Sequence, residues 1–398
     1  DIMSRFVGTV SRGIRTKIIK EGDDLVNIVL NSVMDAVAAD NIPLHDRDIV
    51  GVTEAVLARS QGNYASTDQI GHDVRNKFGG GHIGLIHPIL SRNRFSVCLK
   101  GIAKGVDKIT LMLSYPADEV GNHLLSYEQL EKAGIYDYSK LFTEEEYTKL
   151  FGRSKHPFTN VDYIQFYHDL IEAEGCECEI IFSNKPTDIL KYTNNVLTAD
   201  IHSRKRTMKA LQVEGANVLS IADILNESVD GSGYNEEYGL LGANMATEDM
   251  VKLFPRDSFK FANDLQAAFK ERTGKNIECL IYGDGAFKDS VGQIWELADP
   301  VVSPGYTKGL EGVPNELKLK YLADNDFKDL KGDDLSHAIV DAIKHKEAQA
   351  LDENARLGTT PRKLTDLIGS LCDLTSGSGD KGTPIILIQG YFDSLAAE

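Results

Sequence analysis

The stretch ECLIYGDGAFKDSVGQ, residues 278–293, is the centre of the fold that the sequence predicts. The residues CLIY favour a short strand, and Gly283-Asp284-Gly285 then breaks it. A carboxylate at the mouth of a strand, between glycines that let the backbone approach a ligand, can present a hard oxygen to a magnesium ion and a phosphate. Asp284 is therefore a candidate site residue. The same tripeptide also suits a tight turn in which the Asp bonds its own backbone, so both interpretations stay open here.

The composition is that of a soluble globular protein. Of 398 residues, 42% are hydrophobic and 26% charged, and no apolar run approaches the ~18 residues that cross a bilayer. The length predicts two or three domains, or one large domain with an insertion. A formal net charge of −17 argues against non-specific binding to nucleic acid. We therefore expect no nucleic-acid partner and no membrane partner.

The cysteines indicate a reducing compartment. There are five, an odd number, and most lie in apolar segments, which is typical of free thiols in a cytoplasmic protein. The first residues lack the continuous apolar segment of a secretory signal, although a cleaved signal would leave no trace. Cys176-x-Cys178 with His168 upstream is only a weak zinc pattern. We expect a cytoplasmic protein.

Two N-terminal segments could bind phosphate. Residues 8–25 combine basic side chains with an abrupt Gly-Asp-Asp stop, and one of the two aspartates is expected to cap a periodic helix. Residues 48–57 predict a buried strand that turns into a helix, with Arg59 as a second phosphate candidate. Either segment could equally be a connection with solvated basic residues.

The middle of the chain predicts further strands and helices around a loop. The triplet at residues 79–81 makes residues 78–88 a candidate mobile lid. Residues 95–103 predict a helix, 116–178 a helical insertion, and 179–183 a return to strand. The basic cluster around residues 202–206 suits carboxylate or phosphate recognition, or a solvated helix face.

The C-terminal half leads into the central strand and then into a glycine-rich loop. A helix over 258–273, closed by Gly274, runs directly into the strand, which places Asn244 and Asp284 at one end of the sheet. Thr360 and Pro361 are expected to begin the last helix. The loop that follows it could wrap phosphate oxygens, although it lacks the P-loop pattern.

Taken in order, these features resemble the coenzyme F-420 gamma-glutamyl ligase family, which adds L-glutamate to a lactyl-phospho-deazaflavin with GTP. The resemblance rests on KEGDDL at 20–25, VTEAVLARSQG at 52–62, GAN at 242–244, FPRDS at 254–258, the strand and aspartate at 280–284, and the helix, loop and strand at 361–390. It covers both ends and residues 236–300 well, and residues 65–200 poorly.

The resemblance implies a set of site residues. Those that would line the nucleotide are Thr16, Lys17, Ile18, Ile19, Glu54, Ala55, Arg59 and Asn244. Those that would close over phosphates and a second ion are Ser376, Gly377, Ser378, Gly379, Asp380, Lys381 and Gly382. Asp284 would bind a divalent metal, and Asp284 and Arg59 would carry catalysis.

Two positions depart from the family pattern. The family's other metal aspartate falls on Leu241, and the threonine after the strand aspartate is Gly285. Glu237 is the replacement metal ligand that we predict, with Glu236 and Asp289 as alternatives.

The implied function is a ligase that forms a gamma-glutamyl amide bond through an acyl phosphate. GTP or ATP would be the co-substrate, with Mg²⁺ or Mn²⁺ and K⁺ as candidate ions. The partners would be L-glutamate, a small carboxylate-bearing acceptor such as a deazaflavin or a folate-like molecule, and a second copy in a homodimer. The alternative is a nucleotide- or metabolite-binding protein on the same scaffold whose catalysis changed with the loss of the aspartate.

The implied fold is a mixed α/β sheet with flanking helices and a helical insertion. We predict ligase-like parts over residues 1–115 and 179–398, separated by the insertion at 116–178. One sheet is expected to contain the segments 48–53, 179–183, 278–282 and 384–389.

Overall fold

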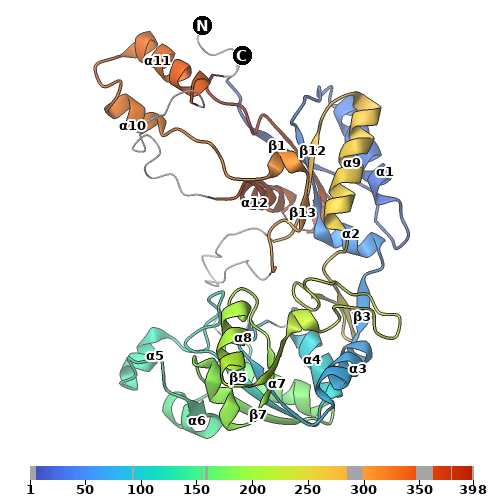
Figure 1. Cartoon of the computed structure of the whole chain (residues 1–398), viewed down its shortest axis with the longest axis vertical. Helices are drawn as coiled ribbons and strands as arrows, with labels where there is room; N and C mark the ends of the chain where they lie inside the picture. The colour runs from blue at the N-terminus through green and yellow to red at the C-terminus, as the bar shows by residue number, and fades with distance from the viewer. Residues whose placement is uncertain are drawn as a thin grey trace.

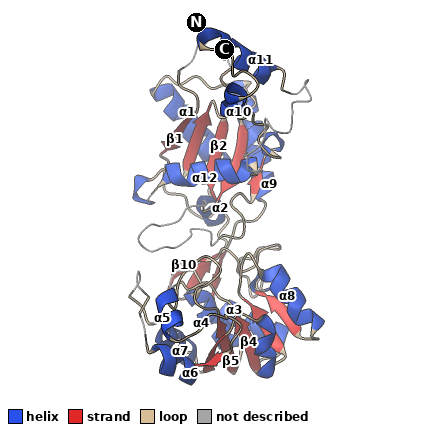
Figure 2. Cartoon of the chain, turned by 90° about the vertical axis from the view of Figure 1, so that its left-hand side faces the viewer, coloured by secondary structure: helices blue, strands red, loops and turns tan. Residues whose placement is uncertain are grey.

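The computed structural model describes residues 6–91, 94–153, 155–156, 160–284, 299–346, 362–377 and 379–396. These residues form two lobes, each built around its own sheet, and a small third sheet lies on the side of the second lobe that faces the first (Figure 1). Helices flank both large sheets (Figure 2), so the predicted mixed α/β fold is confirmed. Within the described ranges, no helix is both long and apolar enough to cross a membrane.

The first lobe, at the top of Figure 1, contains a five-stranded sheet in the order β1-β14-β2-β12-β13. Its strands are β1 (Val10–Ile14), β2 (Ile49–Thr53), β12 (Glu278–Tyr282), β13 (Gly305–Tyr306) and β14 (Ile385–Gln389). β2 and β12 run parallel, whereas the other neighbouring pairs are antiparallel. Segments from both halves of the chain therefore build one sheet.

Helices cover both faces of this sheet. The helices of this lobe are α1 (Leu25–Ala39), α2 (Glu54–Ser60), α9 (Ser258–Thr273), α10 (Leu319–Asp324), α11 (Gly332–Lys344) and α12 (Leu364–Ser376), of which α10 and α11 lie away from the sheet and pack against each other (Figure 1). α1 and α9 bury side chains such as Val33 and Leu265 against one face. α12 packs Ile368 and Cys372 against the other face. The central strands β2, β12 and β14 are consequently almost wholly buried.

The second lobe contains a six-stranded sheet in the order β6-β7-β5-β4-β8-β9. Its strands are β4 (His82–Ile86), β5 (Lys108–Leu113), β6 (Phe142–Thr143), β7 (Glu177–Phe182), β8 (Asn195–Thr198) and β9 (Asn217–Ser220). Its helices are α3 (Thr67–Phe78), α4 (Ser96–Gly105), α5 (Tyr127–Lys132), α6 (Glu144–Phe151), α7 (Tyr163–Glu172) and α8 (Arg204–Val213). All neighbouring pairs are parallel except β6 with β7, which is the wiring of a doubly wound α/β sheet.

The third sheet is antiparallel and has the order β10-β11-β3. Its strands are β3 (Tyr64–Ser66), β10 (Asn244–Thr247) and β11 (Met250–Lys252). β3 follows closely on α2 of the first lobe, and the chain returns to that lobe shortly after β11. Two segments that cross between the lobes therefore lie beside each other at this sheet (Figure 1).

Several local predictions are confirmed. Asp24 caps α1, with its carboxylate accepting the N–H of Asn27 at 3.2 Å. α9 covers Ser258–Thr273, and Gly274 closes it in the left-handed conformation at φ 71°. Its apolar stripe and its capping glycine are both local signals, which is why the sequence sufficed.

The expectation that residues 179–183 share a sheet with the central strand is wrong. β7 (Glu177–Phe182) lies in the second lobe, where it pairs in parallel with β5 from Lys108↔Glu177 to Leu113↔Phe182. A short apolar run predicts a buried strand but not its partner, because pairing is set by contacts far along the chain. The segment 116–178 supplies α5, α6, α7 and the edge strand β6, and its status as an insertion stays a prediction.

The lid expected at residues 78–88 is also wrong. Gly79 caps α3, and the three consecutive glycines have φ values of 76°, 79° and 74° that turn the chain into β4. β4 lies between β5 and β8, and four of its five residues are buried. The glycines serve a helix end and a tight turn, not a mobile loop. The last helix begins at Leu364 with Lys363 at its N-cap position, while Thr360 and Pro361 lie outside the described residues.

The cap of α1 makes a first prediction. Asp24→Ala should lower the free energy of unfolding by about 1 kcal/mol, because it leaves an N–H of the first turn without its acceptor. The matched control is Asp40→Ala at the other end of the same helix. A negative charge there is unfavourable to the helix dipole, so stability should stay unchanged or rise slightly. Urea unfolding measures both, and equal losses would contradict the assignment.

Candidate functional site

The predicted nucleotide segments meet at one edge of the five-stranded sheet. Thr53 at the end of β2 lies opposite Tyr282 at the end of β12. Ile385 at the start of β14 lies opposite Val52 on one side and opposite Ile14, the end of β1, on the other. The loop after β1, the start of α2, Asp284 and the loop before β14 therefore leave the sheet at the same edge. The sequence places these four segments far apart, and the strand register brings them together.

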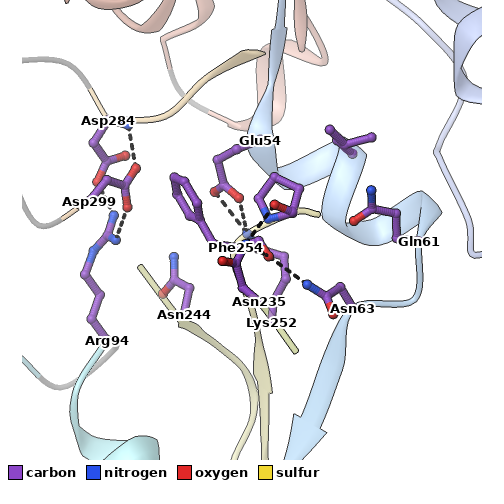
Figure 3. A network of polar contacts seen from close by, with 12 residues as sticks. Glu54, Gln61, Asn63, Arg94, Asn235, Asn244, Lys252, Phe254, Asp284 and Asp299 are labelled. Atoms are coloured by element: carbon purple, nitrogen blue, oxygen red, sulfur yellow. Dashed lines mark hydrogen bonds and ion pairs between the residues drawn. The ribbon is translucent and has the colours of Figure 1, made fainter. Parts of the chain in front are cut away.

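The second lobe presents polar side chains to this edge (Figure 3). Arg94 lies just before α4, Asn244 begins β10, and Lys252 ends β11. In Figure 3 Arg94 points toward Asp284 and Asp299, and Lys252 points toward Glu54. The candidate site therefore lies between the lobes, with carboxylates from the first lobe and cations from the second.

One arginine joins two aspartates. Arg94 Nη1 donates to Asp299 Oδ1 at 2.8 Å, and its Nη2 forms an ion pair with Asp284. The backbone N–H of Asp284 donates to Asp299 Oδ2 at 2.7 Å. The side chain of Asp299 is only 3% exposed, whereas that of Asp284 is 29% exposed. Asp299 is thus an anchored carboxylate, and Asp284 is the one that a ligand can reach.

Gly283 permits this approach. A Cβ at Gly283 would lie 2.5 Å from Asp299 Oδ2, closer than any side chain allows. The glycine before Asp284 is therefore needed because a carboxylate from another segment occupies the space. Gly283 and Asp284, the first two residues of the Gly-Asp-Gly tripeptide, therefore belong to a charged cluster. Gly285 lies outside the described residues.

The charges of this cluster depend on each other. Burial alone would lower the pKa of Arg94, but the carboxylates of Asp299 and Asp284 raise it above its ordinary value. Arg94 therefore stays a cation, and its charge compensates the buried carboxylate of Asp299.

A second ion pair crosses between the lobes beside the first. Lys252 Nζ lies 3.0 Å from Glu54 Oε1 and 2.9 Å from Glu54 Oε2. Both side chains are largely buried, with 14% and 12% exposed. Burial raises the pKa of Glu54 and outweighs the attraction of Lys252, while Asp299 raises the same pKa and Arg94 lowers it. The two ion pairs are therefore close enough to influence each other (Figure 3).

Side-chain amides bind together the two segments that cross between the lobes. Asn63 Nδ2 donates to Phe254 O at 2.7 Å, and Arg256 Nη1 donates to Asn63 Oδ1 at 2.6 Å. Gln61 and the backbone of Arg256 exchange two further hydrogen bonds, at 2.7 and 2.9 Å. Asn235 adds bonds to the carbonyls of Phe254 and Pro255. The FPRDS motif thus holds the junction next to the charged site.

The loop after β1, whose residues Thr16 to Ile19 are predicted to line the nucleotide, contains both exposed and buried side chains. Thr16 Oγ1 accepts the hydroxyl of Ser32 at 2.9 Å, and Lys17 forms an exposed ion pair with Asp23. Ile18 is 73% exposed, whereas Ile19 is buried in the core. Thr16 and Ile18 thus border the edge, but the side chain of Ile19 serves packing.

The glycine-rich loop before β14, predicted to close over phosphates, lies beside the loop after β1. Arg15 Nε donates to the carbonyl of Lys381 at 3.3 Å, which joins the two loops at the sheet edge. Gly377 and Gly382 have φ values of 63° and 66°, and the residues Gly379–Lys381 form a short 3₁₀ turn with exposed side chains. Ser378 lies outside the described residues.

Two predicted residues lie away from the charged cluster. Arg59 is exposed in the last turn of α2, and the contacts drawn in Figure 3 do not involve it. Glu237 is exposed, and its backbone N–H donates to Asn235 Oδ1 at 3.0 Å. Leu241 is wholly buried in the apolar core of the second lobe. The alternative ligand Asp289 lies outside the described residues.

The sequence did not indicate Arg94, Lys252 or Asp299. Asp299 lies seventeen residues after the end of the central strand, and no local sequence pattern indicates that it contacts Asp284. Arg94 and Lys252 are single basic residues at the ends of regular elements. Only the arrangement of the lobes reveals their roles.

The donor set around Asp284 suits a hard cation. Two carboxylates lie together, and oxygen ligands are those that Mg²⁺ and Mn²⁺ prefer. Within the described ranges, however, no three His, Cys, Asp or Glu side chains are arranged as a metal site. A divalent ion here would need phosphate oxygens or water to complete its shell.

The F420-0:gamma-glutamyl ligase family model matches residues 13–390, which is nearly the whole chain. The chain belongs to this family. It is therefore a gamma-glutamyl ligase, an enzyme that joins an acid to an amino acid. No curated protein was found to match the chain.

The inter-lobe ion pair gives a second prediction. Lys252→Met should lower the free energy of unfolding by about 3 kcal/mol, because it leaves Glu54 buried without its partner. The double variant Glu54→Gln/Lys252→Met should recover most of that loss, since no buried charge remains.

The control is Lys260→Met, because the side chain of Lys260 is 72% exposed and forms an ion pair with Asp264. It should cost less than about 1 kcal/mol. Urea unfolding monitored by circular dichroism compares the variants. Similar losses in the two single variants would mean that burial does not strengthen the Lys252 contact.

Proposed function

We propose that the protein joins L-glutamate to a small carboxylate-bearing acceptor through an acyl phosphate, with GTP or ATP as co-substrate. The observation that carries this proposal is the convergence of four segments at one sheet edge, opposite two cations from the other lobe. A deazaflavin or a folate-like molecule would supply the acceptor carboxylate. The family supports the ligase reaction, and the acceptor is our extension of it.

The chemistry requires two displacements. An oxygen of the acceptor carboxylate attacks the γ-phosphorus, forms an O–P bond and releases the nucleoside diphosphate. The amine of L-glutamate then attacks the acyl carbon, forms the amide bond, loses a proton and releases inorganic phosphate. Both steps need alignment of reactants and neutralisation of phosphate charge more than they need covalent participation of the protein.

The described residues offer the required groups. We assign Arg15, Lys17 and the loop 376–382 to the phosphates, because Arg15, Lys17 and the loop residues 377 and 379–382 are exposed at the same edge. Asn244 would contact the nucleotide from the second lobe, as the family resemblance implies. Arg59 and Glu237 remain sequence-based candidates for phosphate and metal contact. K⁺ is a candidate for the ion at the loop.

A divalent ion, Mg²⁺ or Mn²⁺, fits the same edge. Asp284 would hold it, because this carboxylate is partly exposed and has a second carboxylate beside it. When bound, such an ion supplies positive charge to the phosphate oxygens.

The third prediction tests this role of Asp284. Asp284→Asn should keep the fold, since Asn tolerates the same backbone, while it weakens Mn²⁺ binding and lowers turnover by a factor of ~100 or more. Phosphate release from GTP and ATP with L-glutamate and candidate acceptors measures turnover, and calorimetry measures Mn²⁺ binding. The matched control is Asp264→Asn on the exposed side of α9. Unchanged Mn²⁺ affinity and turnover in Asp284→Asn would refute the assignment.

The fourth prediction concerns assembly and location. We infer a homodimer, as the family resemblance implies. β10 is the outer strand of the third sheet, its last three residues are exposed, and such an edge can pair with another chain. Light scattering at micromolar concentration should give twice the mass of the chain, and a monodisperse monomer would argue against the dimer.

The five cysteines are free thiols, four of them buried, as expected in the cytoplasm where we place the enzyme.

A further inference from the structure

We propose that Asp299 is the second carboxylate ligand of the divalent ion, and that Arg94 occupies the cation position of the metal-free enzyme until the ion displaces it. The inference rests on the proposed metal role of Asp284. It concerns a residue that neither the sequence pattern nor the family resemblance indicated. It also gives Arg94 two successive roles.

The geometry shows that one cation can serve both carboxylates. The guanidinium of Arg94 contacts Asp299 at 2.8 Å and Asp284 through its other terminal nitrogen. The backbone of Asp284 is also bonded to Asp299 at 2.7 Å, which fixes the two residues relative to each other. Two oxygens that reach one guanidinium are near enough for a small shift to bring both to one divalent ion.

The position of Asp299 also explains the loss of the family's second aspartate. That aspartate falls on Leu241, whose wholly buried side chain lies in an apolar core and offers no oxygen. The next residue, Gly242, packs against the residue after Asp299, because a Cβ on Gly242 would lie 2.9 Å from Pro300 Cδ. Asp299 therefore lies beside the segment that carries the aspartate in the family. A carboxylate has moved in the sequence but stays near the same place in space.

Burial explains why Arg94 must be present when the ion is absent. Asp299 is 3% exposed, and a buried carboxylate without a counterion is strongly unfavourable. A divalent ion would take over this compensation and leave the guanidinium free. Arg94 comes from the second lobe, so its release would free a cation at the mouth of the site. There it can stabilise the negative charge of the transferred phosphoryl group.

This exchange leaves the lobes connected. Lys252 and Glu54 form the second ion pair across the same interface, and the amide contacts of Asn63 with Phe254 hold the junction. Neither contact includes Asp284 or Asp299. Binding of the ion should therefore change one inter-lobe contact without separating the lobes.

The fifth prediction is a set of Mn²⁺ titrations of the full-length protein without nucleotide. Asp299→Asn should weaken Mn²⁺ binding by about tenfold or more, as Asp284→Asn does, because each removes a ligand. Arg94→Gln should have the opposite effect and strengthen Mn²⁺ binding by about tenfold, because the competing cation is gone. The same variant should lower turnover by a factor of ~100, since the released cation is missing.

The controls separate charge from fold. Arg75→Gln removes an exposed arginine of the same lobe and should leave Mn²⁺ binding unchanged. The double variant Arg94→Gln/Asp299→Asn buries no unpaired charge, so it tests the ligand role if Asp299→Asn alone is unstable. Circular dichroism and melting temperature without metal check the fold of each variant.

The outcomes distinguish this inference from the proposed function. If Asp284→Asn weakens Mn²⁺ binding, but Asp299→Asn binds as the wild type does and the double variant binds as tightly as Arg94→Gln, the role of Asp299 is wrong while the metal role of Asp284 stands. If Arg94→Gln leaves Mn²⁺ affinity unchanged or lowers it, Arg94 does not compete with the ion. If none of the aspartate variants changes Mn²⁺ binding, the proposed metal site itself falls.

Discussion

The parallel pairing of β2 with β12 is the contact on which the site depends. Five residue pairs, from Glu278↔Ile49 to Tyr282↔Thr53, align two strands that are more than two hundred residues apart in the chain. Because the pair is parallel, both strands end at the same edge, and Glu54 and Asp284 leave them side by side. Every residue of β12 is buried between α9 and α12, which fixes this register firmly.

The interface between the lobes is built from charge, and this has a physical consequence. Three ion pairs lie there, two of them made by Arg94, and their side chains are at least 70% buried. A buried ion pair is favourable only while both partners stay matched. An apolar interface would hold the lobes more tightly but would offer no group to a phosphate or a metal. In a buried ion pair, the attraction between the charges is nearly offset by the cost of removing them from water, so one charged partner can be replaced by another. The hydrogen-bonded amides of the junction cannot easily be replaced in this way.

The sequence predicted what local signals determine. The cap at Asp24, the helix Ser258–Thr273 and the strand Glu278–Tyr282 follow from periodicity, capping residues and glycines within a few positions. It failed where distant contacts decide: the apolar run of β7 revealed a strand but not its sheet. The sequence left Gly283 open between a tight turn and a ligand site, whereas the structure shows that it is needed because Asp299 approaches it from another segment. Arg94 and Lys252 carry no local signature, since their partners lie in the other lobe.

Under our proposal for Asp299, the departure at Leu241 would leave a metal site in place while its residues change. What a divalent ion requires is a number of oxygens at short range, and their order along the chain has no effect on their binding. Leu241 is buried and offers no oxygen, and in our proposal Asp299 supplies one from the segment that packs against Leu241's neighbour through Gly242 and Pro300. The buried position of Asp299 demands a compensating positive charge, which Arg94 supplies across the interface when no ion is bound. The guanidinium is therefore the counterpart of the buried carboxylate that it compensates, and that same carboxylate is the group that our proposal assigns to a divalent ion.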